Sequence, residues 1–199
     1  MGILQSRDCD CFFDDLKKIK LAYVITASKG TTDLEYIKRH KEKMDKLRID
    51  YEEIDVEGSN ENDLREIFKD KNAVYVDGGN TFYLLKAVRE SGFDKIITKL
   101  LEKGVVYVGA SAGSYIACPT IEMATWKPKQ KDRFGVTDFS ALNLVPLLIT
   151  AHYVPEMEAV LKDEISNAKY PTRILKDGQG ILVENENYKF VGEEEEIRL

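Results

Sequence analysis

Short apolar runs alternate with longer amphipathic segments along the first half of the chain. Residues 21–26 (LAYVIT) are almost continuously apolar, residues 51–56 alternate between apolar and polar positions, and residues 73–76 form another apolar run. Runs of this length are typical of strands, and a continuously apolar run is typical of a parallel strand covered on both faces. These segments are therefore predicted as strands, with helices between them.

The intervening segments have helical spacing. Residues 33–48 place apolar side chains on one side, and a second helix is predicted from a cap at Ser59 or Asn60 to residue 70. Further helices are predicted for FYLLKAVRE, which follows residues 77–81, and for residues 94–103. This alternation predicts an α/β fold, with a three-layer, doubly wound, mostly parallel sheet and helices on both faces.

The remaining segments are less regular. Residues 2–6 are predicted as a short edge strand and residues 12–18 as a helical turn or loop. Residues 120–144 lack periodicity, as expected of a functional cover or a disordered loop. Beyond them we predict a strand at 147–151, a helix at 156–168, and closing strands at 172–175, 180–183 and 188–191.

Length and charge narrow the possible classes. The 199 residues, of which 43% are hydrophobic, fit one domain over residues 1–199. The net charge of −6 argues against a nucleic-acid partner, because phosphate binding needs clustered basic residues. The N-terminus lacks the basic start and apolar core of a signal peptide, and no apolar run is long enough to cross a bilayer. We therefore expect a cytoplasmic protein without a membrane partner.

Cysteine and histidine usage predicts neither a disulfide framework nor a metal site. The three cysteines, Cys9, Cys11 and Cys118, are an odd number, and the first two lack a second pair. The two histidines, His40 and His152, stand in unrelated contexts, and His40 is expected to be solvated on a charged helix. No metal or organic cofactor is expected.

The segment at residues 103–119 (KGVVYVGASAGSYIACP) carries the main candidate for chemistry. A strand at 105–108 runs into the pattern Gly-x-Ser-x-Gly, from Gly109 to Gly113, and a helix follows. A nucleophile at such a sharp turn needs small neighbours, because the backbone is strained and packs closely against the sheet. Ser111 is therefore a candidate nucleophile, although the same pattern also occurs in turns that catalyse nothing.

A serine nucleophile needs a base, and His152 follows a predicted strand directly. The alternative for His152 is a hydrogen-bonded polar group at a strand end. Spacing leaves the orienting acid open among Asp132, Asp138, Asp177 and Glu184. With Asp177 the chain order is Ser, His, Asp, whereas Asp132 or Asp138 would restore the Ser, acid, His order of α/β-hydrolases.

A second turn of small residues, Gly78-Gly79-Asn80, also follows a buried strand. Two glycines there allow the backbone to come close to whatever lies above the sheet. The carboxyl ends of parallel strands meet at one edge of a sheet. We therefore expect this turn and the turn at residues 109–113 to face one another across one crevice.

Four segments together resemble the aspartyl dipeptidase (peptidase E) family of serine peptidases. They are GGNTFYLLKAV, GASAGSYIACPTIE, ALNLVPLLITAHY and LKDGQGILVEN, in the family's order, within a likeness from about residue 21 to residue 192. The resemblance implies a fold similar to class I glutamine amidotransferases, with serine in place of their cysteine. It implies Ser111 as nucleophile, His152 as general base, and an oxyanion hole from the backbone N–H groups of Gly79 and Ala112.

The resemblance also bears on the acid and on substrate binding. Asp177, preceded by Lys176, stands where the family has a longer carboxylate after proline, and Asn80 is a candidate for substrate binding. Trp126, the other candidate, stands where members similar to the bacterial dipeptidase carry an aspartate. The family's arginine for acidic side chains is missing between residues 152 and 169. Cations that could replace it, unless they form a solvated loop, are Lys127, Lys129, Lys131 and Arg133.

We therefore expect hydrolysis of peptide bonds in small peptides, with Asp-X dipeptides as one candidate class, through an acyl-enzyme on Ser111. The partner is a small peptide substrate, and the protein is expected to be a monomer or a homodimer. The alternatives are a cyanophycinase-like or other amide hydrolase, and a catalytically silent binding module of the same fold.

Overall fold

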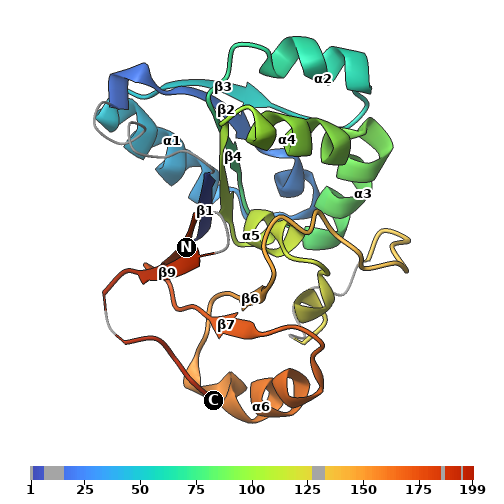
Figure 1. Cartoon of the computed structure of the whole chain (residues 1–199), viewed down its shortest axis with the longest axis vertical. Coiled ribbons are helices and arrows are strands. Elements are labelled where there is room, and N and C mark those ends of the chain that lie inside the picture. Colours follow the sequence, from blue (N-terminus) through green and yellow to red (C-terminus); the bar gives the residue numbers. More distant parts are fainter. Residues whose placement is uncertain (1, 7–15, 127–132, 185–186, 194) are drawn as a thin grey trace.

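A sheet of seven strands organises the computed structural model, which describes residues 2–6, 16–126, 133–184, 187–193 and 195–199 (Figure 1). The strand order is β3-β2-β4-β5-β1-β8-β9. The strands are β1 (Gly2–Ser6), β2 (Lys20–Val24), β3 (Asp50–Ile54), β4 (Ala73–Val76), β5 (Val106–Ala110), β8 (Gly180–Glu184) and β9 (Asn187–Val191).

Strands β3, β2, β4 and β5 are mutually parallel, whereas β1 runs antiparallel to β5 and parallel to β8. Strand β9 pairs antiparallel with β8. The predicted edge strand at residues 2–6 is therefore wrong, because β1 is hydrogen-bonded on both sides within the sheet. A five-residue strand carries no local signal for which partners it will find.

The register of β1 decides which loops share an edge of the sheet. Gly2 lies opposite Ala110, the last residue of β5, and also opposite Gly180, the first residue of β8. The start of β8 and the end of β5 therefore lie at the same edge. Glu184, at the end of β8, lies at the opposite edge.

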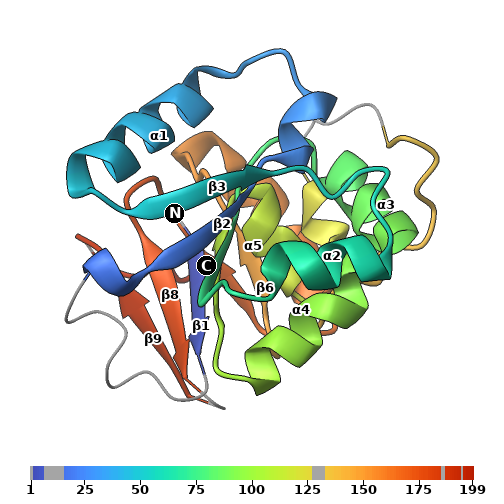
Figure 2. The same ribbon diagram turned by 90° about the horizontal axis from the view of Figure 1, so that it is seen from above.

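The two faces of the sheet carry separate apolar clusters. Tyr23 and Ala73 pack with Met44 of α1 on one face, whereas Val24 and Val76 belong to the core beneath the other helices. Figure 2 shows α1 on one face and α2, α4 and α5 on the other. The helix bounds are α1 (Glu35–Leu47), α2 (Glu61–Phe68), α3 (Thr81–Ser91), α4 (Phe93–Glu102) and α5 (Ala112–Ala117).

A second sheet pairs β6 (Leu148–Thr150) in parallel with β7 (Thr172–Ile174), and α6 (Glu158–Asn167) connects them. The segments predicted as closing strands are thus divided, because β7 joins this small sheet and β8 and β9 extend the main one. Short 3-10 helices are η1 (Leu16–Lys18), η2 (Thr26–Gly30), η3 (Glu122–Ala124) and η4 (Pro155–Met157).

The predicted class, an α/β fold with a mostly parallel sheet between helices, is confirmed. Across the described ranges, no helix combines the length and the apolar content that crossing a bilayer requires.

The N-cap of α2 gives a test of the fold. The Asn60 side chain accepts hydrogen bonds from the N–H groups of Asn62 and Asp63, and Asp63 bonds back to the Asn60 N–H. Loss of such a capping box exposes unpaired N–H groups. We expect Asn60→Ala to lower the free energy of unfolding by about 1 kcal/mol in urea denaturation. The control Asn62→Ala, on the exposed first turn, should change it by less than about 0.5 kcal/mol.

Candidate active site

Ser111 lies at the turn between β5 and α5, with φ 50° and ψ −107°. This is a backbone conformation that non-glycine residues rarely adopt. It is tolerated because the turn packs tightly: a Cβ on Gly113 would overlap the carbonyl oxygen of Val76. The Gly-x-Ser-x-Gly pattern is thus a steric requirement of this turn, which presents the half-buried Ser111 side chain at the edge of the sheet.

His152 lies two residues beyond β6, also with a positive φ, 57°. Its Nε2 is 3.0 Å from the Oγ of Ser111. The buried hydroxyl of Tyr115, in α5, accepts a hydrogen bond of 3.0 Å from the N–H of Ala151. This bond ties the helix that follows the serine to the loop that carries the histidine.

Asp177 completes a chain of contacts, because its Oδ1 is 2.7 Å from Nδ1 of His152. The parallel pairing of β6 with β7 explains how the two meet. Thr150 lies opposite Ile174, and both strands continue from this pair into the loops that carry His152 and Asp177. Their approach is therefore a consequence of strand register.

The turn that carries Asp177 is held by a buried glutamine. Gln179, 2% exposed, accepts a hydrogen bond of 2.9 Å from the N–H of Lys176 and donates one of 3.1 Å to the carbonyl oxygen of Glu193. Asp177 itself is an exposed side chain. The backbone beneath the carboxylate is thus fixed while the carboxylate faces solvent.

The other acids considered from the sequence do not contact His152 where the structure describes them. Asp138 pairs with Arg89 at 3.2 Å and accepts a hydrogen bond from the N–H of Ser140. Glu184 lies at the far edge of the sheet, and Asp132 is outside the described residues.

The turn at Gly78 and Gly79 lies beside the serine, as expected. A Cβ on Gly78 would be 3.2 Å from the Cβ of Ser111. Gly79 has φ 134°, and a Cβ there would overlap the carbonyl oxygen of Ala27, so only glycine fits. Ala112 begins α5, so its N–H belongs to a first turn, whose N–H groups have no partners within the helix.

Residues 8–191 match the sequence model of peptidase family S51. The chain belongs to this family. A peptidase of Listeria monocytogenes, itself uncharacterized, is 30% identical over 142 residues, which are 71% of this chain and 69% of the relative. An uncharacterized peptidase of Pasteurella multocida is 27% identical over 183 residues, 89% of this chain and 88% of the relative. Peptidase E of Escherichia coli is 45% identical over 80 residues, 40% of this chain and 33% of that protein.

Two solved structures share the fold of this S51 peptidase. A Listeria monocytogenes protein provisionally named peptidase E superposes with a TM-score of 0.82 at 23% identity, covering 97% of this chain and 98% of that one. A peptidase from an acI-B1 actinobacterium gives 0.66 at 13% identity, covering 96% and 87%. The resemblance to the peptidase E family and its class I glutamine amidotransferase-like fold is thereby confirmed, and the protein is a serine-type peptidase.

Asn80 and Trp126 of the S51 peptidase, the two candidates for substrate binding, lie in different environments. The Oδ1 of Asn80 caps α3 by accepting hydrogen bonds from the N–H groups of Phe82 and Tyr83. The side chain of Trp126 is 7% exposed and belongs to the core. Asn80 is buried to the same extent, at 7% exposed, so a substrate contact stays a prediction for both residues.

Of the four candidate cations in this S51 peptidase, Arg133 is described. Its guanidinium lies 5.6 Å from the ring centre of Phe139 and 5.9 Å from that of Phe82. Lys127, Lys129 and Lys131 are outside the described residues. The Arg133 guanidinium thus lies over two aromatic rings, and its binding of an acidic substrate side chain stays a prediction.

The environments of the other histidine and of the cysteines can be compared with what the sequence predicts. The prediction that His40 is solvated is wrong, because its Nδ1 lies 2.9 Å from Oδ2 of Asp77 and its side chain is partly covered. Burial raises the pKa of Cys118 to about 12, so this thiol is unreactive at neutral pH. Cys9 and Cys11 are outside the described residues, and within those residues no three His, Cys, Asp or Glu side chains form a metal-binding group.

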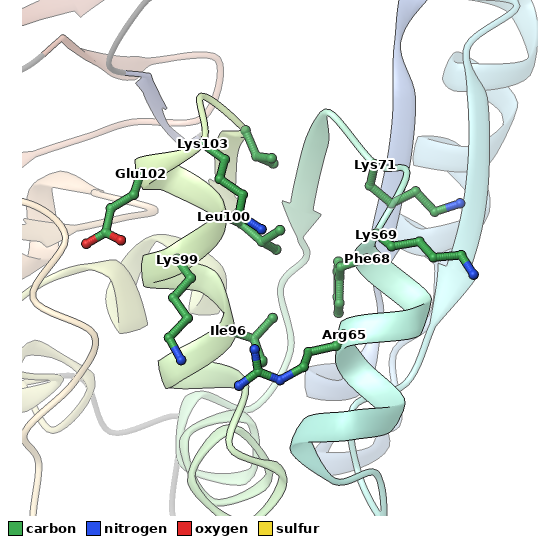
Figure 3. Close-up of a pocket in the computed structure, with 10 residues that line it drawn as sticks. Arg65, Phe68, Lys69, Lys71, Ile96, Lys99, Leu100, Glu102 and Lys103 are labelled. Atoms are coloured by element: carbon green, nitrogen blue, oxygen red, sulfur yellow. The ribbon is translucent and has the colours of Figure 1, made fainter.

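A groove of 710 Å³ lies between α2 and α4 of the S51 peptidase (Figure 3). Apolar side chains of Phe68, Ile96 and Leu100 line it together with several lysines and Arg65. Lys71 and Val105, also in its lining, precede β4 and β5, so the groove lies at the amino ends of these strands. It is therefore separate from the candidate active site, which lies at their carboxyl ends.

The close packing of the serine turn predicts that one methyl group added at Gly113 will strongly destabilise the protein. In Gly113→Ala the new Cβ would overlap the Val76 carbonyl oxygen, so the free energy of unfolding should fall by about 3 kcal/mol or more in urea denaturation. Gly58→Ala is the control for steric overlap, because no atom lies within 4 Å of an added Cβ at Gly58, whose φ of 76° adds only a backbone cost. It should cost only about 1–2 kcal/mol. Equal losses in the two variants would contradict the close approach at Gly113.

Proposed function

We propose that this peptidase cleaves peptide bonds of small peptides through an acyl-enzyme on Ser111. The observation that carries the proposal is the line of contacts from Asp177 through His152 to Ser111, with distances of 2.7 and 3.0 Å. Both distances lie within hydrogen-bonding range, as proton transfer requires. This line joins three loops that are far apart in the sequence.

Each residue has a role in the proposed reaction. With Nδ1–H donated to Asp177, Nε2 of His152 takes the Ser111 proton as Oγ attacks the carbonyl carbon. The tetrahedral oxyanion would be stabilised by the N–H groups of Gly79 and Ala112. The protonated His152 then gives its proton to the leaving amine. Water, activated by the same nitrogen, hydrolyses the ester and releases Ser111.

The residues beside Ser111 are open to solvent. The side chains of His152 and Asp177 are 55% and 80% exposed. The contact between them therefore contributes little to stability, since water screens exposed polar groups. Water can reach Nε2 of His152 for the second half of the reaction.

Specificity for an N-terminal aspartate is a finer part of the proposal. Its support is the similarity to Escherichia coli peptidase E, which spans 33% of that protein. The sequence between His152 and Lys169 contains no arginine, so another cation would have to bind an acidic side chain. Arg133 is the described candidate among those predicted from the sequence.

Replacement of Ser111 tests the nucleophile directly. Ser111→Ala should lower turnover of the best peptide substrate by roughly 10⁴-fold or more, with unchanged thermal unfolding, because no other group can form the acyl-enzyme. It should also abolish labelling by a fluorophosphonate, which requires an activated hydroxyl. Ser59→Ala, on a turn before α2, is the control and should keep both activities. Retained turnover in Ser111→Ala would remove Ser111 from the mechanism.

The substrate class is tested with dipeptides and aminoacyl amides that have Asp, Glu, neutral or basic first residues. We expect turnover of at least one dipeptide, with Asp-X preferred, and loss of that preference in Arg133→Ala if Arg133 binds the carboxylate. Turnover of other first residues would keep the mechanism and reject the Asp-X specificity. Cleavage of aspartyl-rich polymer alone would favour a cyanophycinase-like activity, and no turnover or labelling would favour a silent module.

A further inference from the structure

A buried carboxylate lies directly before the two glycines of the oxyanion turn. Asp77 follows β4, is 1% exposed, and extends the sheet by donating its N–H to the carbonyl oxygen of Val24 at 3.0 Å. Burial of a charged group is costly unless hydrogen bonds compensate it. Asp77 therefore needs partners, and the structure supplies them from other elements.

The two oxygens of Asp77 have different partners. Oδ2 accepts a hydrogen bond from the hydroxyl of Tyr23 and lies 2.9 Å from Nδ1 of His40 in α1. Oδ1 accepts the N–H of Gly78 at 2.7 Å. The carboxylate is thus fixed on one side by β2 and α1, and on the other side it holds the first glycine of the turn.

Tyr36 holds the same glycine from its other end. Tyr36 lies one turn before His40 in α1. Its hydroxyl donates a hydrogen bond of 2.9 Å to the carbonyl oxygen of Gly78. Burial, together with the negative charges of Asp77 and Asp33, raises the pKa of Tyr36 well above its usual range. The hydroxyl therefore keeps its proton and remains a donor. Both backbone polar groups of Gly78 are bound by side chains.

The carbonyl of Gly78 and the N–H of Gly79 belong to one peptide unit. A trans peptide is planar, so these two groups point in opposite directions and cannot turn independently. A hydrogen bond from Tyr36 to the carbonyl oxygen therefore fixes the direction of the Gly79 N–H. Hydrogen bonds in series also polarise one another, which makes that N–H a better donor.

We propose that Tyr36 and Asp77 are positioning residues that aim the Gly79 N–H at the oxyanion. This inference rests on the proposed function, in which that N–H binds the developing negative charge. Neither side chain touches the reacting atoms, since both act through Gly78. Gly79 cannot be held through a side chain of its own, because any Cβ would overlap Ala27. The hydrogen bonds to Gly78 supply the preorganisation that an oxyanion donor needs.

Tyr36→Phe tests the proposal, because it removes only the hydroxyl. We expect kcat to fall about 10-fold with KM within twofold of wild type, since the donor matters most in the transition state. The rate of Ser111 labelling by a fluorophosphonate should fall by a similar factor, because the phosphonyl oxygen enters the same oxyanion hole. The pH profile of labelling should keep its shape, since His152 is untouched. Tyr51→Phe, another half-buried tyrosine, is the control and should change neither rate.

A merely structural role for Tyr36 gives a different result. It would lower the melting temperature and leave kcat and the labelling rate of the folded protein within twofold of wild type, which would overturn the proposal. Asp77→Asn is a second variant, in which the side chain keeps its size. We expect it to lower kcat, as Tyr36→Phe does. Ser111→Ala separates failure of the positioning role of Tyr36 from failure of the proposed function. If it is inactive while Tyr36→Phe is fully active, this inference alone fails; if it retains turnover, the proposed function fails.

Discussion

The pairing of β1 with both β5 and β8 is the constraint on which the candidate site depends. β5 ends at the serine turn, and β8 begins directly after the turn that carries Asp177. Because β1 runs antiparallel to β5 and parallel to β8, the end of one strand and the start of the other lie at a common edge. If β1 and β8 had both run parallel to β5, the end of β8, with Glu184, would lie at that edge instead. Strand direction thus selects which carboxylate can reach His152.

Close approach of backbone segments is the second feature that the site requires. Ser111 and His152 both have positive φ values, a conformation that costs about 1–3 kcal/mol for each non-glycine residue. The surrounding core offsets this cost: Gly113 packs on Val76, and Tyr115 bonds to Ala151. The two residues whose side chains meet are therefore both in a strained conformation, and the packed elements around them keep them there.

The two carboxylates near the site differ in environment and in consequence. Asp177 is exposed and pairs with His152, so solvent screens the pair and the carboxylate serves orientation more than stability. Asp77 is buried and hydrogen-bonded by Tyr23 and the N–H of Gly78, and removal of any partner would leave a costly unpaired group. The exposed acid lies on the side of the reacting histidine. The buried acid supports the backbone turn on the other side of Ser111.

Local pattern was enough to predict the α/β class, most helices, and the turns at Gly78 and Ser111. These features depend on apolar periodicity and on small residues at fixed spacing, which are properties of neighbouring residues. Ser111 could be named from the Gly-x-Ser-x-Gly pattern and His152 because it follows an apolar run directly, and the motif resemblance chose Asp177 among the four candidate acids. Tyr36 had no such signal, since it is one polar aromatic residue on an amphipathic helix.

Tertiary structure decided the rest. The interior place of β1, the separate sheet of β6 and β7, and the contacts of His40 with Asp77 all depend on partners that are distant in the chain. Spacing left Asp132, Asp138, Asp177 and Glu184 as candidates for the acid, and the meeting of His152 with Asp177 follows from the register of β6 and β7. Register is set by hydrogen bonds between strands and by the side chains packed against them. A single sequence contains no direct record of those pairings.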